Sequence, residues 1–306
     1  MHYSVLLEET INNLKVKESG IYVDATLGMA GHSKEILKRN KKGFLFAFDQ
    51  DSDAIKVSDA TLKIVGKNYK LINENFAFLK RELEKEKITL VDGIIFDLGL
   101  SSPQIDNPQK GFSFMHDGPL DMRMDKRNKK SAKEIVNTYP LEELIHIFYV
   151  YGEVELAKPI AKNIVDFRKT KEIKTTKELV DIIESAVGSK YFFKKHPERP
   201  IFQALRIEVN NELKVLENVL PDAISLLKKG GRLCVITFHS LEDRIVKNIF
   251  RNYSEINDLV KGLPTIPEEY KPLIKLVNKK PIIPSDKELE ENSRSKSAKL
   301  RVIERI

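Results

Sequence analysis

The sequence has little of what disulfide-rich, membrane and metal-binding proteins require. It contains one cysteine, Cys234, in 306 residues, so it cannot form an internal disulfide, and a cytoplasmic protein is expected. No apolar run approaches the roughly 18–20 residues that cross a bilayer, so no membrane association is predicted. The six histidines have no metal-ligand spacing and form no cluster with the cysteine, so no metal site is predicted. Cys234 lies in the apolar run "RLCVITF" and is expected to be a small core residue.

Basic residues are in excess, and they are unevenly distributed. The net charge is +7, which permits a polyanionic partner without requiring one. Within residues 186–206, five basic side chains and four aromatic ones accompany a single acidic residue, and the last fourteen residues are similarly basic. Basic clusters with interleaved aromatics suit a phosphate backbone beside unstacked bases, so Lys194, Lys195 and Arg199 are candidate RNA contacts. A solvated surface is the alternative interpretation of each cluster.

The first hundred residues alternate between apolar strands and helical segments. Nearly continuous apolar strands separated by helices predict a doubly wound, mostly parallel α/β sheet covered on both faces, the Rossmann-like class. Strands are predicted at 20–27, 43–49, 69–76 and 91–100, with helices at 32–39 and 52–65.

The alternation stops near residue 109, where an all-helical insert is predicted. Its helices are expected at 141–148, 156–167 and 175–188, the last with Thr175 and Glu178 spaced as a capping box and Gly188 at its end. The predicted organisation is a core in two parts, 1–108 and 201–306, around an insert at 109–200 that recognises the substrate. The second part of the core is expected to contain two helices divided at Pro221 and ended by Gly230 and Gly231, a strand at 232–238, a helix capped by Ser240, and a closing strand pair at 271–277 and 298–306.

The turn after the first strand is rich in small residues. Gly28 and Gly31 let the backbone turn tightly and approach a ligand at the carboxyl end of the sheet. The pattern from Asp24 to Ala30 is D-x-T-x-G-x-A, not the GxGxxG of dinucleotide-binding proteins, and it resembles the E/D-x-G-x-G-x-G loop of S-adenosylmethionine-dependent methyltransferases. Asp24 suits the cationic amino-acid end of that cofactor, and Asp49, at the end of the second strand, suits both ribose hydroxyls. An NAD-dependent oxidoreductase and a non-enzymatic RNA-binding protein are the alternatives.

The segment "DLGLSSPQ" at 97–104 follows the fourth strand and should border the same crevice. Methyltransferases that act on base amines have a D/N/S-P-P-aromatic loop here, and Ser102-Pro103 matches half of it. Such an amine is a weak nucleophile, so polar acceptors must align it, and its base must leave the stack. Ser102 is therefore a candidate acceptor, and Phe112 and Phe114 are candidate clamps for the base, with ordinary packing as the alternative.

Several long segments together resemble one known family, the bacterial small-subunit rRNA cytosine-N4 methyltransferases called RsmH or MraW. The runs "DGPLDMRMD" and "TFHSLEDR" are the most specific. The matching segments are "HYSVLLEE" (2–9), "DATLGMAGHS" (24–33), "FDQD" (48–51), "DGIIFDLGLSSPQID" (92–106), "GFSFMHDGPLDMRMD" (111–125), "RPIFQALRIEVNNEL" (199–213), "GGRLCVITFHSLEDRIVK" (230–247) and "RSKSAKLRVIER" (294–305).

The resemblance implies a Rossmann-like core with a helical insert, S-adenosyl-L-methionine as cofactor, and methylation of N4 of a decoding-centre cytidine. The implied partner is 16S rRNA, either free or within the 30S subunit. Ser102 becomes the catalytic candidate, while Asp121 and Arg123 contact the substrate or form an internal ion pair. The cofactor contacts that the resemblance implies are Ala30, Gly31, His32, Asp49, Phe76, Asp97 and Gln104.

Overall fold

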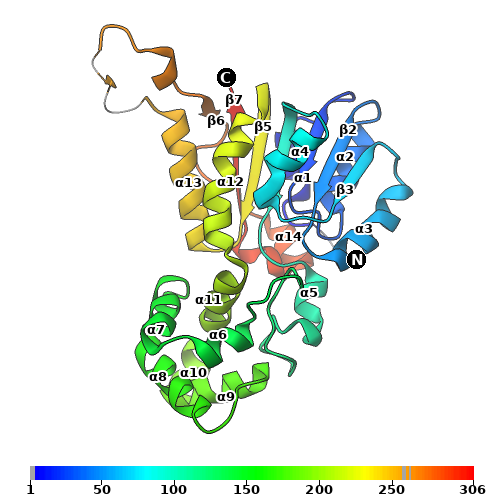
Figure 1. The fold of residues 1–306 in the computed structure, drawn as a ribbon. Coiled ribbons are helices and arrows are strands. Elements are labelled where there is room, and N and C mark those ends of the chain that lie inside the picture. The colour runs from blue at the N-terminus through cyan, green and yellow to red at the C-terminus, as the bar shows by residue number, and fades with distance from the viewer. Residues whose placement is uncertain (1–3, 257–259, 262) are drawn as a thin grey trace. The chain divides into compact units, whose positions relative to one another are not determined.

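The computed structural model describes residues 4–256, 260–261 and 263–306, which form two compact units (Figure 1). Unit 1 comprises Met1–Gly99 and Leu213–Ile306, and unit 2 comprises Leu100–Glu212. Unit 2 contains the range 109–200 expected for the insert and extends past it at both ends. Residues 201–212, which the sequence interpretation assigned to the core, cluster with unit 2.

Unit 1 is built on a sheet that has seven strands in the described part of the chain, in the order β3-β2-β1-β4-β5-β7-β6. Neighbouring strands from β3 to β5 are parallel, whereas β7 pairs antiparallel with both β5 and β6. This mostly parallel order confirms the Rossmann-like prediction. The strands are β1 (Ile21–Asp24), β2 (Phe44–Phe48), β3 (Tyr69–Ile72), β4 (Val91–Asp97), β5 (Leu227–Thr237), β6 (Ile274–Leu276) and β7 (Lys299–Arg305).

Helices cover both faces of this sheet. Because successive residues of a strand point to opposite sides, an apolar strand contributes side chains to the clusters on both faces. Along β5, Leu233 and Val235 join one apolar cluster, and Cys234 and Ile236 join the other. The first cluster includes side chains from α4 (Leu79–Lys85), α12 (Glu212–Ser225) and α13 (Ser240–Ser254). The second includes side chains from α1 (Leu7–Leu14), α2 (Gly31–Arg39) and α3 (Ser52–Lys63).

Three features of the second half of unit 1 differ from the sequence predictions. Pro221 does not divide a helix: it lies inside α12, whose buried Leu220 and Ala223 continue one apolar face through it. The break comes earlier, at Asn211, whose φ of 53° ends α11 (Glu198–Asn210). Gly230 and Gly231 do not end a helix either.

These glycines lie within β5, where the pairing with β4 shifts register. Leu227 pairs with Val91 and Arg232 with Gly93, so the intervening residues of β5 bulge out. A bulge needs unusual backbone angles, and Gly230 has a φ of 79°. The next helix, α13, is capped by His239 and not by Ser240, because the His239 side chain accepts the Glu242 amide.

Other boundaries also move. The third strand ends at Ile72 instead of 76, and Phe76 begins the short helix η1 (Phe76–Phe78). The closing pair is confirmed as β6 and β7. The sequence interpretation did not predict α1 or α14 (Asp286–Glu291), nor η4 (Glu268–Tyr270) or η5 (Ser293–Ser297). No helix of the described residues is long and apolar enough to cross a membrane.

Unit 2, all of which the structure describes, is helical and has its own apolar core. Its predicted capping box is confirmed, since Thr175 and Glu178 exchange side-chain and backbone bonds at the start of α9, and Gly188 follows its last residue. The core gathers apolar side chains from all of its longer helices. The helices are α5 (Ser102–Asp106), η2 (Pro108–Lys110), α6 (Ala132–Thr138), α7 (Leu141–Val150), α8 (Ala157–Arg168), α9 (Thr176–Val187), α10 (Ser189–Lys195) and α11.

Candidate active site

Three carboxylates lie at the ends of three neighbouring parallel strands in unit 1. Asp24 ends β1, Asp97 ends β4, and Asp49 directly follows β2. Because β1 pairs with both β2 and β4, the chain reverses its winding here. Ligands of open α/β sheets bind at this kind of switch point, outside the carboxyl ends of the strands. The candidate site is therefore the strand-end edge that carries these acids.

Asp24 is buried directly behind the glycine turn. Its side chain is 1% exposed, and its two oxygens accept the Ser33 hydroxyl at 2.7 Å and the Thr26 amide at 3.1 Å. Burial raises the pKa of Asp24 to about 6, although these hydrogen bonds act in the opposite direction. Asp24 thus ties the turn to the first turn of α2, and it places a carboxylate where a nearby cation would be stabilised.

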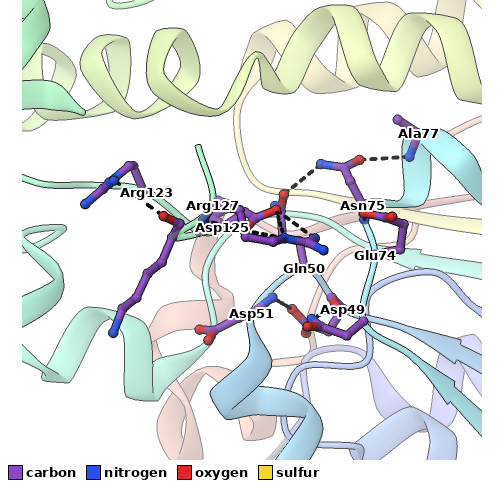
Figure 2. A network of polar contacts seen from close by, with 12 residues as sticks. Asp49, Gln50, Asp51, Glu74, Asn75, Ala77, Arg123, Asp125 and Arg127 are labelled. Carbon is purple, nitrogen blue, oxygen red and sulfur yellow. Dashed lines mark hydrogen bonds and ion pairs between the residues drawn. The ribbon is translucent and has the colours of Figure 1, made fainter. Parts of the chain in front are cut away.

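Asp49 holds the other side of the same turn. One carboxylate oxygen accepts the Gly28 amide at 2.9 Å. The other accepts the Asp51 amide at 2.8 Å (Figure 2). Burial raises the pKa of Asp49 to about 7, and repulsion from Asp51 and Asp24 adds to this effect. Each carboxylate oxygen has a second lone pair, so these bonds leave acceptor capacity for the ribose hydroxyls predicted to bind here.

The turn itself requires small residues at two places. Ala30, the N-cap of α2, has a φ of 62°, a left-handed conformation that glycine adopts more readily. A Cβ on Gly31 would lie 1.7 Å from the Ser4 hydroxyl oxygen, so a side chain there collides with the N-terminal segment. The Leu27 amide also donates to the Phe48 carbonyl at 2.8 Å, which joins the turn to β2.

Asp97 and His32 carry polar atoms that nothing in the described protein satisfies. Asp97 Oδ1 and His32 Nε2 are buried, and among the described residues neither has a hydrogen-bond partner. His32 Nδ1 lies 3.7 Å from Asp97 Oδ2. Burial raises the pKa of Asp97 well above its usual range, helped by Asp24, and burial lowers the pKa of His32 to about 4. Unsatisfied buried polar atoms are rare, and a bound polar ligand is one explanation for them.

Phe76, predicted to contact the cofactor, lies beyond the end of β3 and begins the short helix η1. Its ring meets Phe96 edge to face, with centroids 5.4 Å apart. Asn75 caps this segment by accepting the Ala77 amide at 2.8 Å and donating to the Gln50 side chain at 2.7 Å (Figure 2). The segment is therefore held in place close to the strand end that precedes it.

The segment after Asp97 enters unit 2 as a capped turn of helix. The Ser101 amide donates to Gln104 Oε1 at 3.0 Å, and Ser101 caps α5 with Gln104 in a reciprocal capping box. Ser102 is the first residue of this helix, and Pro103 is the second. Gln104, predicted as a cofactor contact, is buried and uses its side-chain oxygen for the cap.

Asp121 and Arg123 form an ion pair within the loop. Arg123 Nε and Nη2 donate to the two oxygens of Asp121 at 2.7 and 2.8 Å, and Nη1 donates to the Asn128 carbonyl at 2.7 Å. This geometry matches the alternative in which the pair stabilises the loop. Phe112 lies in the core of unit 2, and Phe114 packs against that core with its ring edge to face with Phe202. Contact of these four side chains with a substrate stays a prediction.

The predicted basic residues lie on an exposed part of unit 2. Lys194 and Lys195 end α10, and Arg199 is in the first turn of α11. All three side chains are exposed, and none forms an ion pair with any residue that the structure describes. Surface lysines and arginines of this protein are often paired with nearby acids, so this unpaired group is available to an anionic partner.

Comparison with known proteins identifies the family. The sequence model of the MraW methylase family matches residues 1–306. The chain belongs to the MraW methylase family. A similar solved structure is an rRNA methylase from Streptococcus thermophilus, with 12% identity and a TM-score of 0.45 over 100% of this chain and 99% of that one. Another is a Streptococcus mutans protein in complex with SAH, with 13% identity and a TM-score of 0.44 over 100% of both chains.

As a member of the MraW methylase family, the protein is an S-adenosyl-L-methionine-dependent methyltransferase. The NAD-dependent oxidoreductase therefore has no support. The site fits this cofactor, because buried carboxylates suit its positive charges and because Asp97 Oδ1 and His32 Nε2 lack partners among the described residues. Asp24 and Asp49 would hold its charged and ribose ends, and Phe76 would contact the adenine.

Sequence reasoning missed three side chains that shape the two units. Ser33 donates to Asp24, and a hydroxyl in the first turn of a helix after an acidic strand end is a usable signal for such a bond. Ser4 contacts the Gly31 position from far away in the sequence. Asn210 accepts the Met124 amide and donates to the Met122 carbonyl, both at 2.9 Å, and so fixes the 121–125 loop. No local pattern in the sequence predicts the last two contacts.

Proposed function

We propose that this methyltransferase modifies rRNA, and that it places one methyl group on the exocyclic N4 of a decoding-centre cytidine of 16S rRNA, cytidine 1402. The membership in the MraW methylase family supports an rRNA substrate. The long segments shared with cytosine-N4 methyltransferases, above all "DGPLDMRMD" and "TFHSLEDR", support the choice of atom. The substrate is either free rRNA or the assembled 30S subunit.

The observation that carries the choice of N4 over the ring carbon is the environment of Cys234. Methylation of cytosine at C5 requires a cysteine thiolate that adds to C6 of the ring, whereas an exocyclic amine needs no covalent adduct. Cys234 is fully buried in β5, with its sulfur 3.8 Å from the Thr10 carbonyl oxygen. Burial raises the pKa of this thiol to about 12, so it is neither ionised nor accessible. The sequence has no other cysteine.

The amine needs alignment and a hydrogen-bond acceptor, because its lone pair is delocalised into the cytosine ring. When bound, S-adenosyl-L-methionine supplies a methyl group already activated on a positively charged sulfur, so this transfer requires no metal. We assign the role of acceptor to Ser102, whose position at the start of α5 is fixed by the capping box of Ser101 and Gln104. In this assignment the Ser102 hydroxyl accepts one N–H of the amine and turns its nitrogen toward the methyl.

A basic surface of unit 2 supports binding of the RNA strand. The unpaired, exposed side chains of Lys194, Lys195 and Arg199 provide positive charge for phosphates. The acidic edge of the sheet, by contrast, would repel a phosphate backbone and attract a cation. This division of charge supports an enzyme whose cofactor is positively charged and whose substrate is a polyanion.

The test follows a radiolabelled methyl group from the cofactor into digested rRNA nucleosides, with free 16S rRNA and 30S subunits as parallel substrates. We expect label in N4-methylcytidine, and Cys234→Ala should retain this activity because the thiol takes no part. Ser102→Ala should lower turnover while the affinity for the cofactor stays close to that of the wild type. Label in 5-methylcytidine, or loss of activity in a folded Cys234→Ala protein, would contradict the proposal.

A further inference from the structure

The helix α10 presents an aromatic ring to solvent in a fixed orientation. Phe193 is 67% exposed, whereas the adjacent Phe192 is 7% exposed and belongs to the core of unit 2. The two rings meet edge to face, with centroids 5.4 Å apart and planes at 90°. Such a contact has a preferred geometry, so the buried ring orients the exposed one. An exposed phenylalanine held in this way offers a flat apolar surface, and this surface is available for binding.

Positive charge flanks this ring. Residues three and four apart lie on the same face of a helix, so Lys190 is a neighbour of both Phe193 and Lys194. Both lysines are exposed, and neither forms an ion pair within the described residues. The exposed ring therefore lies on the same short helix as two exposed lysines that are available to phosphates, one of them a turn away on its own face.

We propose that Phe193 is a stacking platform for one unpaired base of single-stranded RNA, and that Lys190 and Lys194 bind the phosphates beside it. This inference rests on the proposed function only in taking RNA as the partner. Every base has a flat face that an aromatic ring can cover, and every nucleotide carries a negative phosphate within reach of such lysines. The combination of ring and charge therefore fits a single strand better than a duplex, whose bases are already stacked.

A second exposed aromatic residue in unit 2 provides a matched control. Tyr149 is 68% exposed on α7, and its segment "LEELIHIFYV" contains two glutamates and no lysine or arginine. Tyr149 and Phe193 therefore have almost the same exposure, but the helix of Tyr149 has no lysine or arginine and that of Phe193 has three lysines. If exposure alone made an aromatic residue bind RNA, the two would behave alike. If the inference is correct, only Phe193 contributes.

The experiment measures binding of a short single-stranded RNA oligonucleotide that contains 2-aminopurine, a base whose fluorescence is quenched by stacking. The full-length variants are Phe193→Leu, which keeps an apolar side chain, Phe193→Trp, which keeps a stacking ring, and the control Tyr149→Leu. We expect Phe193→Leu to weaken binding by about 5- to 150-fold, the range measured for loss of one base–aromatic stack, and to abolish the quenching. Phe193→Trp should restore both, and Tyr149→Leu should change neither.

The salt dependence separates the ring from the lysines. Phe193→Leu removes no charge, so the slope of log K against log salt should stay at its wild-type value. Lys190→Ala should reduce that slope by about 0.7, because one fewer counterion is released from a single strand. The inference would be refuted if Phe193→Leu bound the RNA and quenched its 2-aminopurine as the wild type does. It would also be refuted if Tyr149→Leu lost as much RNA affinity as Phe193→Leu. The methyl-labelling assay is independent: absence of N4-methylcytidine would contradict the proposed function, while stacking on Phe193 would still stand.

Discussion

The buried carboxyl group of Asp24 makes the stability of the cofactor-free protein depend on pH in an unusual direction. In the unfolded chain this group has the ordinary pKa of 3.8, and in the folded protein burial raises its pKa to about 6. Between these values the folded protein holds a proton that the unfolded chain has lost. Protonation thus favours the folded state, and the free energy of unfolding falls as the pH rises through this window. Most carboxylates in proteins, which have lowered pKa values, act in the opposite sense.

The size of the effect follows from the difference between the two pKa values. One pKa unit corresponds to about 1.4 kcal/mol, so a rise from 3.8 to about 6 costs the folded protein about 3 kcal/mol above pH 6. Asp24→Asn removes this ionisation and keeps an oxygen that can accept the Thr26 amide. The free energy of unfolding of the variant minus that of the wild type should therefore increase by about 2 kcal/mol from pH 4 to pH 7, because the first part of the change occurs below pH 4.

The assay is denaturant unfolding of both proteins without cofactor at several pH values in this range. Only the difference between the proteins is interpreted, because groups remote from Asp24 titrate alike in both. Loss of the Asp24 charge also lowers the pKa values of Asp49 and Asp97, which changes the difference in the same direction. Ser33→Ala serves as a control, because it removes the hydroxyl that lowers the pKa of Asp24. In this variant the free energy of unfolding should still fall as the pH rises, but the fall should extend to higher pH than in the wild type. A difference between wild type and Asp24→Asn that stays constant across the range would refute the reasoning, since it would mean that Asp24 ionises normally in the folded protein.

Two further changes test the turn. Asp49→Ala should weaken binding of S-adenosyl-L-methionine in calorimetry by about 1–3 kcal/mol, the cost of lost hydrogen bonds to a charged group. The control Asp53→Ala, on the exposed side of α3, should leave the affinity unchanged. Unchanged affinity in Asp49→Ala would refute the assignment of Asp49 to the ribose. Gly31→Ala should lower the free energy of unfolding by about 1–3 kcal/mol in thermal unfolding, because the new Cβ would collide with Ser4. Adding Ser4→Gly to this variant should restore part of the lost stability. A Gly31→Ala variant as stable as the wild type would show that the N-terminal segment moves aside freely.

Much of unit 1, and the start of α9 in unit 2, could be predicted because local and global signals agree there. The strand "RLCVITF" has four consecutive apolar residues, at 233–236, a pattern that indicates a sheet covered on both faces, and Cys234 and Val235 enter clusters on opposite faces. The capping box of Thr175 and Glu178 is equally local, since the two side chains need only a spacing of three residues. Patterns of this kind contain their own physical cause within a few residues.

The errors arose where packing at a distance overrode a local signal. Pro221 lacks an amide hydrogen, so it favours a helix end, but the apolar residues before and after it bury the same face of α12. Gly230 and Gly231 resemble a helix stop, but they serve a bulge in β5 whose need depends on the register of β4. Neither the packed face nor the register can be read from the neighbouring residues alone.

The strand-end acids of the candidate site could also be predicted only in part from the sequence. The sequence places acids at the ends of β1, β2 and β4, and the order of the strands makes these ends adjacent. The sequence does not reveal that Asp24 and Asp49 accept hydrogen bonds from backbone amides of the turn. It also does not reveal that one carboxylate oxygen of Asp97 is buried and has no hydrogen-bond partner among the described residues. Several carboxylates with raised pKa values in one region oppose the stability of the empty protein, and such a conflict is typical of functional sites. A positively charged cofactor relieves it, because a cation beside these acids lowers their pKa values and stabilises their ionised forms. The unfavourable charge of these acids is thus a physical reason to propose this strand-end edge as the binding place of a sulfonium compound.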